Sequence, residues 1–125
     1  MPITVEWDDE AQTIVRWDFV GRWNFDDVKA ALEKSVSLRK SIEGKSSVIL
    51  NFERSESLPM GAVTQMIQGM AKMPDKREMV VIAGSSGLLK SLAAIYLKVR
   101  RGQNDKLGVV DTLEQARAFI VQNKG

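Results

Sequence analysis

Residues 47–52 read Ser47-Val48-Ile49-Leu50-Asn51-Phe52, a short and largely apolar run. Such a run is typical of a β-strand that is covered on both faces, which is the usual situation in a parallel sheet. Met79–Ala83 is a second such run, and a last strand is expected at about Leu107–Val110. The sequence therefore predicts two buried strands and a further strand of a mainly parallel sheet.

Segments with helical spacing follow these strands. Asn24 is a suitable N-cap, and an apolar stripe predicts a first helix over about residues 25–42, before Gly44. A second helix follows Pro59 and ends before Pro74. The stripes expected to face the core in the first, third and fourth helices are Phe25, Val28, Leu32 and Val36; Leu88, Leu92, Ile95 and Val99; and Leu113, Ala116, Phe119 and Ile120.

The chain opens with an alternating pattern that predicts a β-hairpin. The residues that alternate with polar neighbours are Ile3, Val5 and Trp7, followed by Thr13, Val15, Trp17 and Phe19. Trp7 and Trp17 can meet as a cross-strand pair that fixes the register. The predicted order is ββαβαβαβα, with right-handed crossovers after the hairpin. We therefore expect one α/β domain over residues 1–125, with a mixed, mainly parallel sheet flanked by helices.

The composition argues against several kinds of catalytic and metal-binding site. The 125 residues include neither histidine nor cysteine, which removes the usual proton shuttle, the thiol nucleophile and nearly every zinc ligand set. No serine–base set and no EF-hand pattern is recognisable. We therefore expect a protein that is not an enzyme and that uses no cofactor or metal.

Charge and hydropathy suggest where the protein acts. The 18 basic and 16 acidic residues are mixed along the chain, so nucleic acid is not an expected partner. No stretch approaches the roughly 20 apolar residues that span a bilayer, and the first residues lack the regions of a signal peptide. We expect no transmembrane segment and a cytoplasmic location.

Several features together resemble the STAS domain family. They are the order of the elements, the short length, Gly21 before the first helix, the strand Val48–Phe52 and the segment Asp111–Ala116. This family includes the SpoIIAA-like anti-sigma-factor antagonists and has distant lipid-binding relatives of the CRAL-TRIO kind. The resemblance implies a regulatory domain that binds other proteins.

In regulatory STAS domains, a strand-to-helix loop carries an Asp-Ser-Ser/Thr-Gly motif whose serine is phosphorylated, and the next helix contacts the partner. If Gly61 matches the glycine of that motif, Pro59 and Met60 occupy the serine positions, so this chain departs from the motif. Ser55 and Ser57 are the candidates for holding a phosphate or an anion near the second helix. Ser57 is equally suited to cap that helix.

A second strand-to-helix turn is a candidate anion site. It reads Gly84-Ser85-Ser86-Gly87, and Lys90 follows one turn into the next helix. Two glycines let the backbone approach a ligand, and no acidic residue lies beside them. The same residues also fit an ordinary loop with a serine cap, and the spacing of a nucleotide P-loop is absent. Both interpretations stay open.

Methionines are concentrated in the second helix. Met60, Met66, Met70 and Met73 lie in it or at its ends. The apolar residues there occupy an arc of about 160°, whereas packing on one sheet needs about 100°. Met66 and Met73 lie at one margin, where we expect them to be exposed. Flexible, polarizable methionines suit a surface that accepts a helix, a loop or an acyl chain, with core packing as the alternative.

Two further predictions concern a loop and a helix cap. Trp23, in the loop before the first helix, is a candidate for stacking on a ligand or closing a pocket. Asp111 and Glu114 have the spacing of a capping box for the last helix, and Asp26 and Asp27 suit the positive end of the first helix dipole.

These observations favour a non-catalytic STAS-like module that binds a regulatory protein or a second copy of itself as a homodimer. The predicted binding surface is the loop and helix at about residues 53–73. The alternative is a carrier for an acyl chain or an anionic metabolite, held near the loops after Phe52 and Ala83, where the ends of parallel strands converge.

Overall fold

The computed structural model of the protein describes residues 2–42, 44, 46–56, 59–72, 77–84 and 106–123. In chain order, the elements are β1 (Ile3–Trp7), β2 (Ile14–Gly21), α1 (Phe25–Lys40), β3 (Ser46–Ser55), α2 (Met60–Lys72), β4 (Arg77–Ala83), β5 (Lys106–Val110) and α4 (Leu113–Asn123). The predicted helix with the stripe from Leu88 to Val99 lies outside the described residues. Within the described ranges, no helix has both the length and the apolar character needed to cross a membrane.

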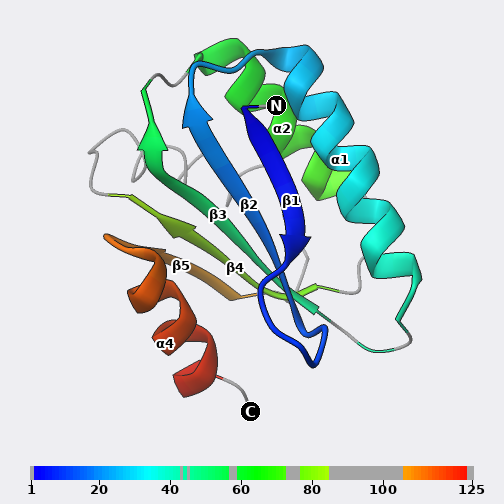
Figure 1. The fold of residues 1–125 in the computed structure, drawn as a ribbon, viewed down its shortest axis with the longest axis vertical. Coiled ribbons are helices and arrows are strands. Elements are labelled where there is room, and N and C mark those ends of the chain that lie inside the picture. The colour runs from blue at the N-terminus through cyan, green and yellow to red at the C-terminus, as the bar shows by residue number, and fades with distance from the viewer. Residues whose placement is uncertain are drawn as a thin grey trace.

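The described residues form an α/β fold with a mixed five-stranded sheet and three helices. The strands lie in the sheet in the same order as in the sequence (Figure 1). β1 is antiparallel to β2, and the neighbouring pairs from β2 to β5 are parallel. The predicted hairpin and the mainly parallel sheet are confirmed. β3 is longer than predicted, because it continues beyond Phe52 to Ser55.

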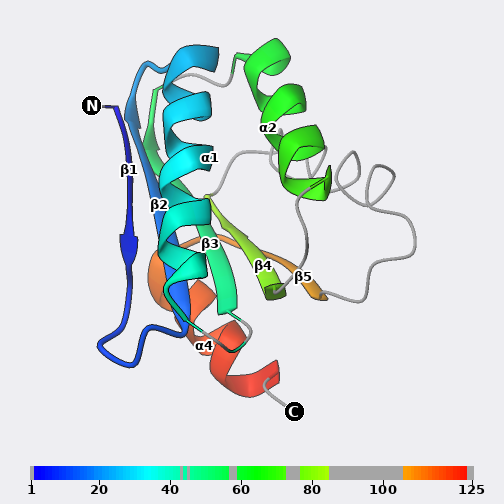
Figure 2. The ribbon, with the colours of Figure 1, turned by 90° about the vertical axis from the view of Figure 1, so that its right-hand side faces the viewer.

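The helices cover both faces of the sheet (Figures 1 and 2). α1 and α2 pack against each other on one face, and α4 packs on β3, β4 and β5 on the opposite face. Alternate residues of β3 serve the two layers: Val48 and Leu50 belong to the cluster under α1 and α2, whereas Ile49 belongs to the cluster under α4. This double coverage explains the apolar run from which the strand was predicted.

Helix α1 begins where the sequence predicts. The Asn24 side chain accepts a hydrogen bond from the backbone N–H of Asp27, and the Asp27 side chain accepts one from Asn24, which makes a capping box. The buried side of the helix is rotated from the predicted stripe. Val28, Ala31 and Ser35 are buried, whereas Phe25 is 40% exposed. Phe25 lies at the start of the helix, where its ring faces Lys29 Nζ at 5.7 Å instead of the core.

The register of the hairpin corrects the predicted tryptophan pair. Trp17 lies opposite Val5, and Trp7 lies opposite Val15, so the two tryptophans are diagonal neighbours and not a direct pair. Trp17 instead stacks on Phe19 of its own strand, with the ring centroids 6.0 Å apart. The alternation itself is confirmed, because Val15, Trp17 and Phe19 are buried.

The cap of α4 lies one residue later than predicted. Thr112 Oγ1 accepts a hydrogen bond from the backbone N–H of Gln115 at 3.1 Å, and Gln115 Oε1 accepts from the backbone N–H groups of Asp111 and Thr112. The capping box is therefore Thr112 with Gln115, and not Asp111 with Glu114. The predicted core side of the helix is confirmed, because Ala116 and Ile120 are buried, and Leu113 and Phe119 pack beside them.

Candidate functional site

The candidate site lies where the parallel strands end. Because β2, β3, β4 and β5 are parallel, their carboxyl ends meet at one edge of the sheet, the usual place for binding sites in α/β folds. The strand-end site, as we define it, comprises residues 21–23 at the end of β2, 53–56 at the end of β3, Gly84 after β4, and 111–113 at the start of α4. The predicted site residues Ser57, Ser85, Ser86, Gly87 and Lys90 lie outside the described residues.

An aromatic cluster adjoins the strand-end site. The rings of Phe19 and Phe52 are stacked with their centroids 4.2 Å apart, and Trp23 packs against Phe19 at 4.9 Å. Trp23 is 4% exposed, so it belongs to the core and is not placed to stack on a ligand, which corrects the sequence prediction. Its ring is covered because it packs against Phe19 of β2 and its centroid lies 6.2 Å from that of Phe52 of β3.

Ser55 is joined to this cluster. Trp23 Nε1 donates a hydrogen bond to Ser55 Oγ, with the two atoms 2.9 Å apart. The indole N–H is thereby satisfied although its ring is buried. Ser55 itself is half-buried at the last position of β3, so a group added to its hydroxyl would compete with the indole for the same oxygen.

A glycine fixes the path of the chain between β2 and β3. Gly21 has a φ of 67°, in the left-handed region that favours glycine. Its carbonyl accepts a hydrogen bond from the backbone N–H of Glu56 at 2.8 Å. A Cβ atom on Gly21 would also lie 3.3 Å from Glu56 Oε2. Gly21 therefore holds the end of β3 beside the start of the loop that carries Trp23.

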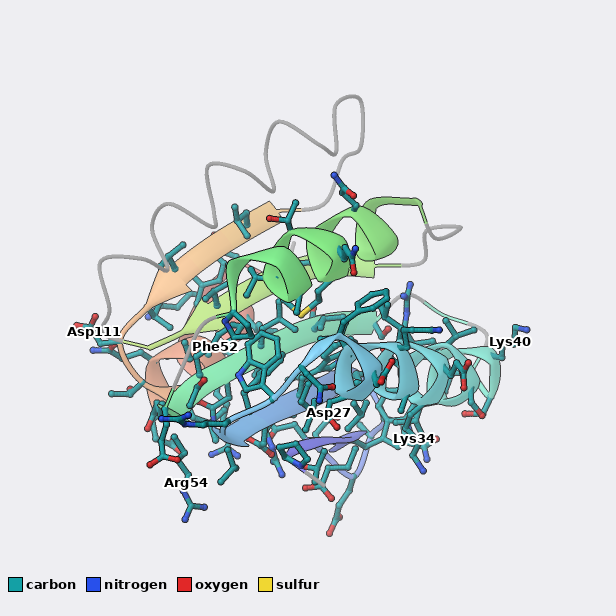
Figure 3. The ribbon with its side chains drawn as sticks, turned by 90° about the horizontal axis from the view of Figure 1, so that it is seen from above. Asp27, Lys34, Lys40, Phe52, Arg54 and Asp111 are labelled. Carbon is teal, nitrogen blue, oxygen red and sulfur yellow. The ribbon has the colours of Figure 1, made fainter. Side chains whose placement is uncertain are left out.

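The end of β3 also anchors α4. Glu53 Oε1 accepts a hydrogen bond from the backbone N–H of Leu113, the first residue of that helix. A carboxylate at this position is favourable because the first N–H groups of a helix are unpaired and carry partial positive charge. The N-terminus of α4 therefore already holds an anion from the protein itself. Figure 3 shows Phe52 within the body of the molecule and Arg54 extending away from it.

Met66 is not part of the exposed methionine surface that the sequence predicts for α2. Met66 is 1% exposed and belongs to the cluster under α1 and α2, so its predicted exposure is wrong. Met60 and Met70 lie in α2, but their side chains are outside the described part, and Met73 is outside it altogether. Met66 is buried because α1 packs beside α2 and widens the side of the helix that is covered.

The described residues on the outward side of α2 are polar or small. Gly61, Gln65 and Gln68 are exposed, and their spacing of four and three residues places them on one side of the helix. A Cβ atom on Gly61 would meet no atom within 4 Å. Ala62 and Val63 on the opposite side are buried. The described part of α2 thus presents an open side next to the strand-end site.

Of the turn that the sequence predicts to bind an anion, the structure describes only Gly84. Gly84 follows β4, and its backbone N–H donates to the carbonyl of Val110 at 2.9 Å. That N–H is therefore used to join the ends of β4 and β5. The remaining residues of the turn, together with Lys90, belong to the residues that are not described, so the anion site stays a prediction.

An ion-pair cluster far from α2 was not predicted. We use this name for Glu6, Asp8, Arg16, Asp18, Glu114 and Arg117. Asp8 is at its centre: its side chain is 3% exposed and accepts hydrogen bonds from Arg16 Nη1 at 2.6 Å, Arg117 Nε at 2.9 Å and Arg117 Nη2 at 2.7 Å. Arg16 also binds Glu6 and Asp18, and Arg117 binds Glu114.

The hydrogen bonds of the cluster favour the charged forms of Asp8, Arg16 and Arg117. The hydrogen bond from Arg117, aided by Arg16 and opposed by burial, lowers the pKa of Asp8 below its usual value of 3.8. The hydrogen bond to Asp8 raises the pKa of Arg117. Burial lowers the pKa of Arg16, but its hydrogen bonds to Asp18 and Asp8 outweigh this effect and raise it overall. An acid with a lowered pKa is poorly suited to donate protons near pH 7.

Sequence reasoning missed this cluster because its key contact joins positions 109 residues apart. The only available signal was that Arg16 and Asp18 share the side of β2 opposite to Trp17. Nothing in the sequence points from Asp8 to Arg117. In the part of the chain that the structure describes, no group of three or more acidic side chains is arranged to hold a metal ion.

Comparison with known proteins gives no match: no family model, no curated protein and no solved structure is similar to this chain. The STAS resemblance therefore remains a proposal.

Proposed function

We propose that the protein is a non-catalytic, STAS-like regulatory module that binds another protein through the strand-end site and the outward side of α2. The observation that carries this proposal is the open stripe of Gly61, Gln65 and Gln68 on the helix that follows β3 in the chain. This placement corresponds to the surface that regulatory STAS domains use. A second copy of the chain is an alternative partner for the same surface.

The chemistry of the surface suits reversible protein binding. Gly61 leaves the helix backbone accessible, so a partner can approach closely. Gln65 and Gln68 supply amide donors and acceptors without the desolvation cost of a charge. Glu53, Arg54 and Glu56 add charges of both signs at the end of β3, the strand that precedes α2 in the chain. An interface of this kind has polar groups at its rim and derives specificity from matching charges.

The test uses a substitution that fills the open stripe. Gly61→Arg adds a long side chain where no neighbouring atom lies within 4 Å, so the fold should remain intact. The matched control is Ser37→Arg, which places the same side chain on an exposed position of α1. Each protein is expressed in cells, its partners are fixed by chemical cross-linking, and the proteins captured with it on an immobilising resin are identified. Light scattering of the purified proteins measures self-association.

We expect Gly61→Arg to reduce the amount of captured partner, or the amount of dimer, at least about tenfold. A clash buried in the interface weakens binding by more than about 1.4 kcal/mol. Ser37→Arg should behave as the unmodified protein. Equal capture and equal self-association by all three proteins would remove the proposed surface.

The alternative function, a carrier for a small ligand, is favoured by one buried atom. Trp17 is 1% exposed, and no described residue offers an acceptor to its Nε1. An unpaired indole N–H in the layer between the sheet and the helices is costly unless a polar group of a ligand or a water meets it. Native mass spectrometry of protein purified from cells tests the carrier: a retained small molecule supports it, and a bare protein mass contradicts it.

A further inference from the structure

Helix α4 is attached to the protein differently from α1 and α2. Its buried side chains belong to a cluster of their own, separate from the larger one under α1 and α2. Of its 11 residues, Ala116 and Ile120 are fully buried, whereas Val121 is 71% exposed. Because the two clusters lie on opposite faces of the sheet, loss of α4 leaves the larger cluster in place.

Polar contacts hold α4 at two points. Glu53 accepts from the backbone N–H of Leu113 at the start of the helix. One turn further along, Arg117 makes a two-pronged contact with Asp8, whose carboxylate is almost fully buried. Both partners come from distant parts of the chain, 60 and 109 residues away. Charge-assisted contacts of this geometry are strong, but each depends on one side chain.

The sheet under α4 is apolar. The residues that α4 covers are Ile14, Ile49, Met79, Val81 and Ala83. Gly108 of β5 also lies under it, where Phe119 fills the space that a side chain would need. Movement of α4 away from the sheet would therefore expose a strip of hydrophobic surface on the central strands.

We propose that α4 is a hinged cover, which leaves and rejoins the sheet as a unit while the rest of the fold stays intact, and that the contact between Arg117 and Asp8 is its latch. The hinge is the exposed pair Asp111 and Thr112 between β5 and α4. Opening exposes the apolar strip, and closing buries it. Sub-global opening occurs in contiguous units, and α4 is such a unit because its buried side chains form a cluster separate from the larger one under α1 and α2.

Native-state hydrogen exchange, followed residue by residue by NMR, tests this cover. In the unmodified protein, the amides of α4 should exchange at least about tenfold faster than those of β2 and β3. Arg117→Gln removes the latch but leaves Asp8 paired with Arg16. We expect it to speed exchange in α4 by about a further tenfold, with the central strands unchanged.

The matched control is Glu114→Gln, which removes the other partner of the same guanidinium but keeps the tie to the sheet. Its effect on α4 should stay below about threefold, as for an exposed pair within a helix. Arg117→Lys keeps the charge without the two-pronged geometry and should fall between the two. Common exchange rates for α4 and β3, equal acceleration of both elements by Arg117→Gln, or equal effects of Arg117→Gln and Glu114→Gln on α4 would overturn the proposal.

Discussion

Replacement of Asp8 by Asn probes the ion-pair cluster most directly. The substitution keeps the shape of the side chain and removes its charge, while Arg16 and Arg117 remain beside it. Of the three hydrogen bonds that Asp8 accepts, those to the oxygen that becomes an amide NH2 are lost, because that group only donates, and the others lose their charge assistance. Arg16 retains two other carboxylates, Glu6 and Asp18, and Arg117 retains one, Glu114. We expect the free energy of unfolding to fall by about 2 kcal/mol, below the full cost of an unpaired buried charge.

The pH dependence identifies the cause of that loss. The pKa of Asp8 is lowered in the folded protein, so the unfolded chain binds the proton more readily. The stabilisation is fully present above the usual value of 3.8 and is lost as the pH falls through the lower folded-state pKa. The difference between the two proteins should therefore be constant from pH 7 to pH 5 and should shrink below the usual pKa.

Urea denaturation followed by far-ultraviolet circular dichroism at several pH values measures both effects. Glu10→Gln is the control, because Glu10 is an exposed carboxylate on the same turn as Asp8. It should change stability by less than about 0.5 kcal/mol. The electrostatic reasoning fails if Asp8→Asn costs nothing at pH 7, or if its cost remains the same at a pH where Asp8 is protonated in both states.

Three further substitutions test the packing and the caps. Met66→Ala should lower the free energy of unfolding by about 3 kcal/mol in urea titrations, because the side chain is buried; an effect below about 1 kcal/mol would contradict its placement. Gly108→Ala places a Cβ atom 2.7 Å from Phe119 Cζ and should cost about 1–3 kcal/mol, and a double-mutant cycle with Phe119→Leu should recover most of this loss. Asn24→Ala removes one half of a capping box and should cost about 1 kcal/mol by thermal denaturation, whereas Ser37→Ala in the exposed middle of α1 should cost nothing.

Much of the fold could be predicted because its signals are local. The apolar run around Ile49 and the alternation around Trp17 each fix a strand, since burial follows directly from spacing. The Asn24 cap was found for the same reason, because its partner lies three residues away. The cap of α4 was misplaced by one residue, because Asp111 and Thr112 are both good N-caps and only the geometry distinguishes them.

The candidate site was harder to predict because it depends on long-range packing. The burial of Met66 follows from the position of α1 beside α2, which helical spacing alone does not contain. The position of Trp23 in a loop favours a contact with a ligand, but its indole N–H donates a hydrogen bond to Ser55, 32 residues later. The contact between Asp8 and Arg117 is longer still. Sequence patterns report which side of an element is apolar, and they do not report which element covers it.

The agreement between strand order and sequence order has a consequence for synthesis on the ribosome. Each of the strands that the structure describes after β1 hydrogen-bonds to the described strand made before it, so none of these strands has to wait for a later one in order to join the sheet. The nascent chain can add β3 to the finished hairpin, and β4 to β3, as each emerges from the exit tunnel. Growth from one edge keeps the loops to be closed short at every stage, which favours productive folding over misassembly.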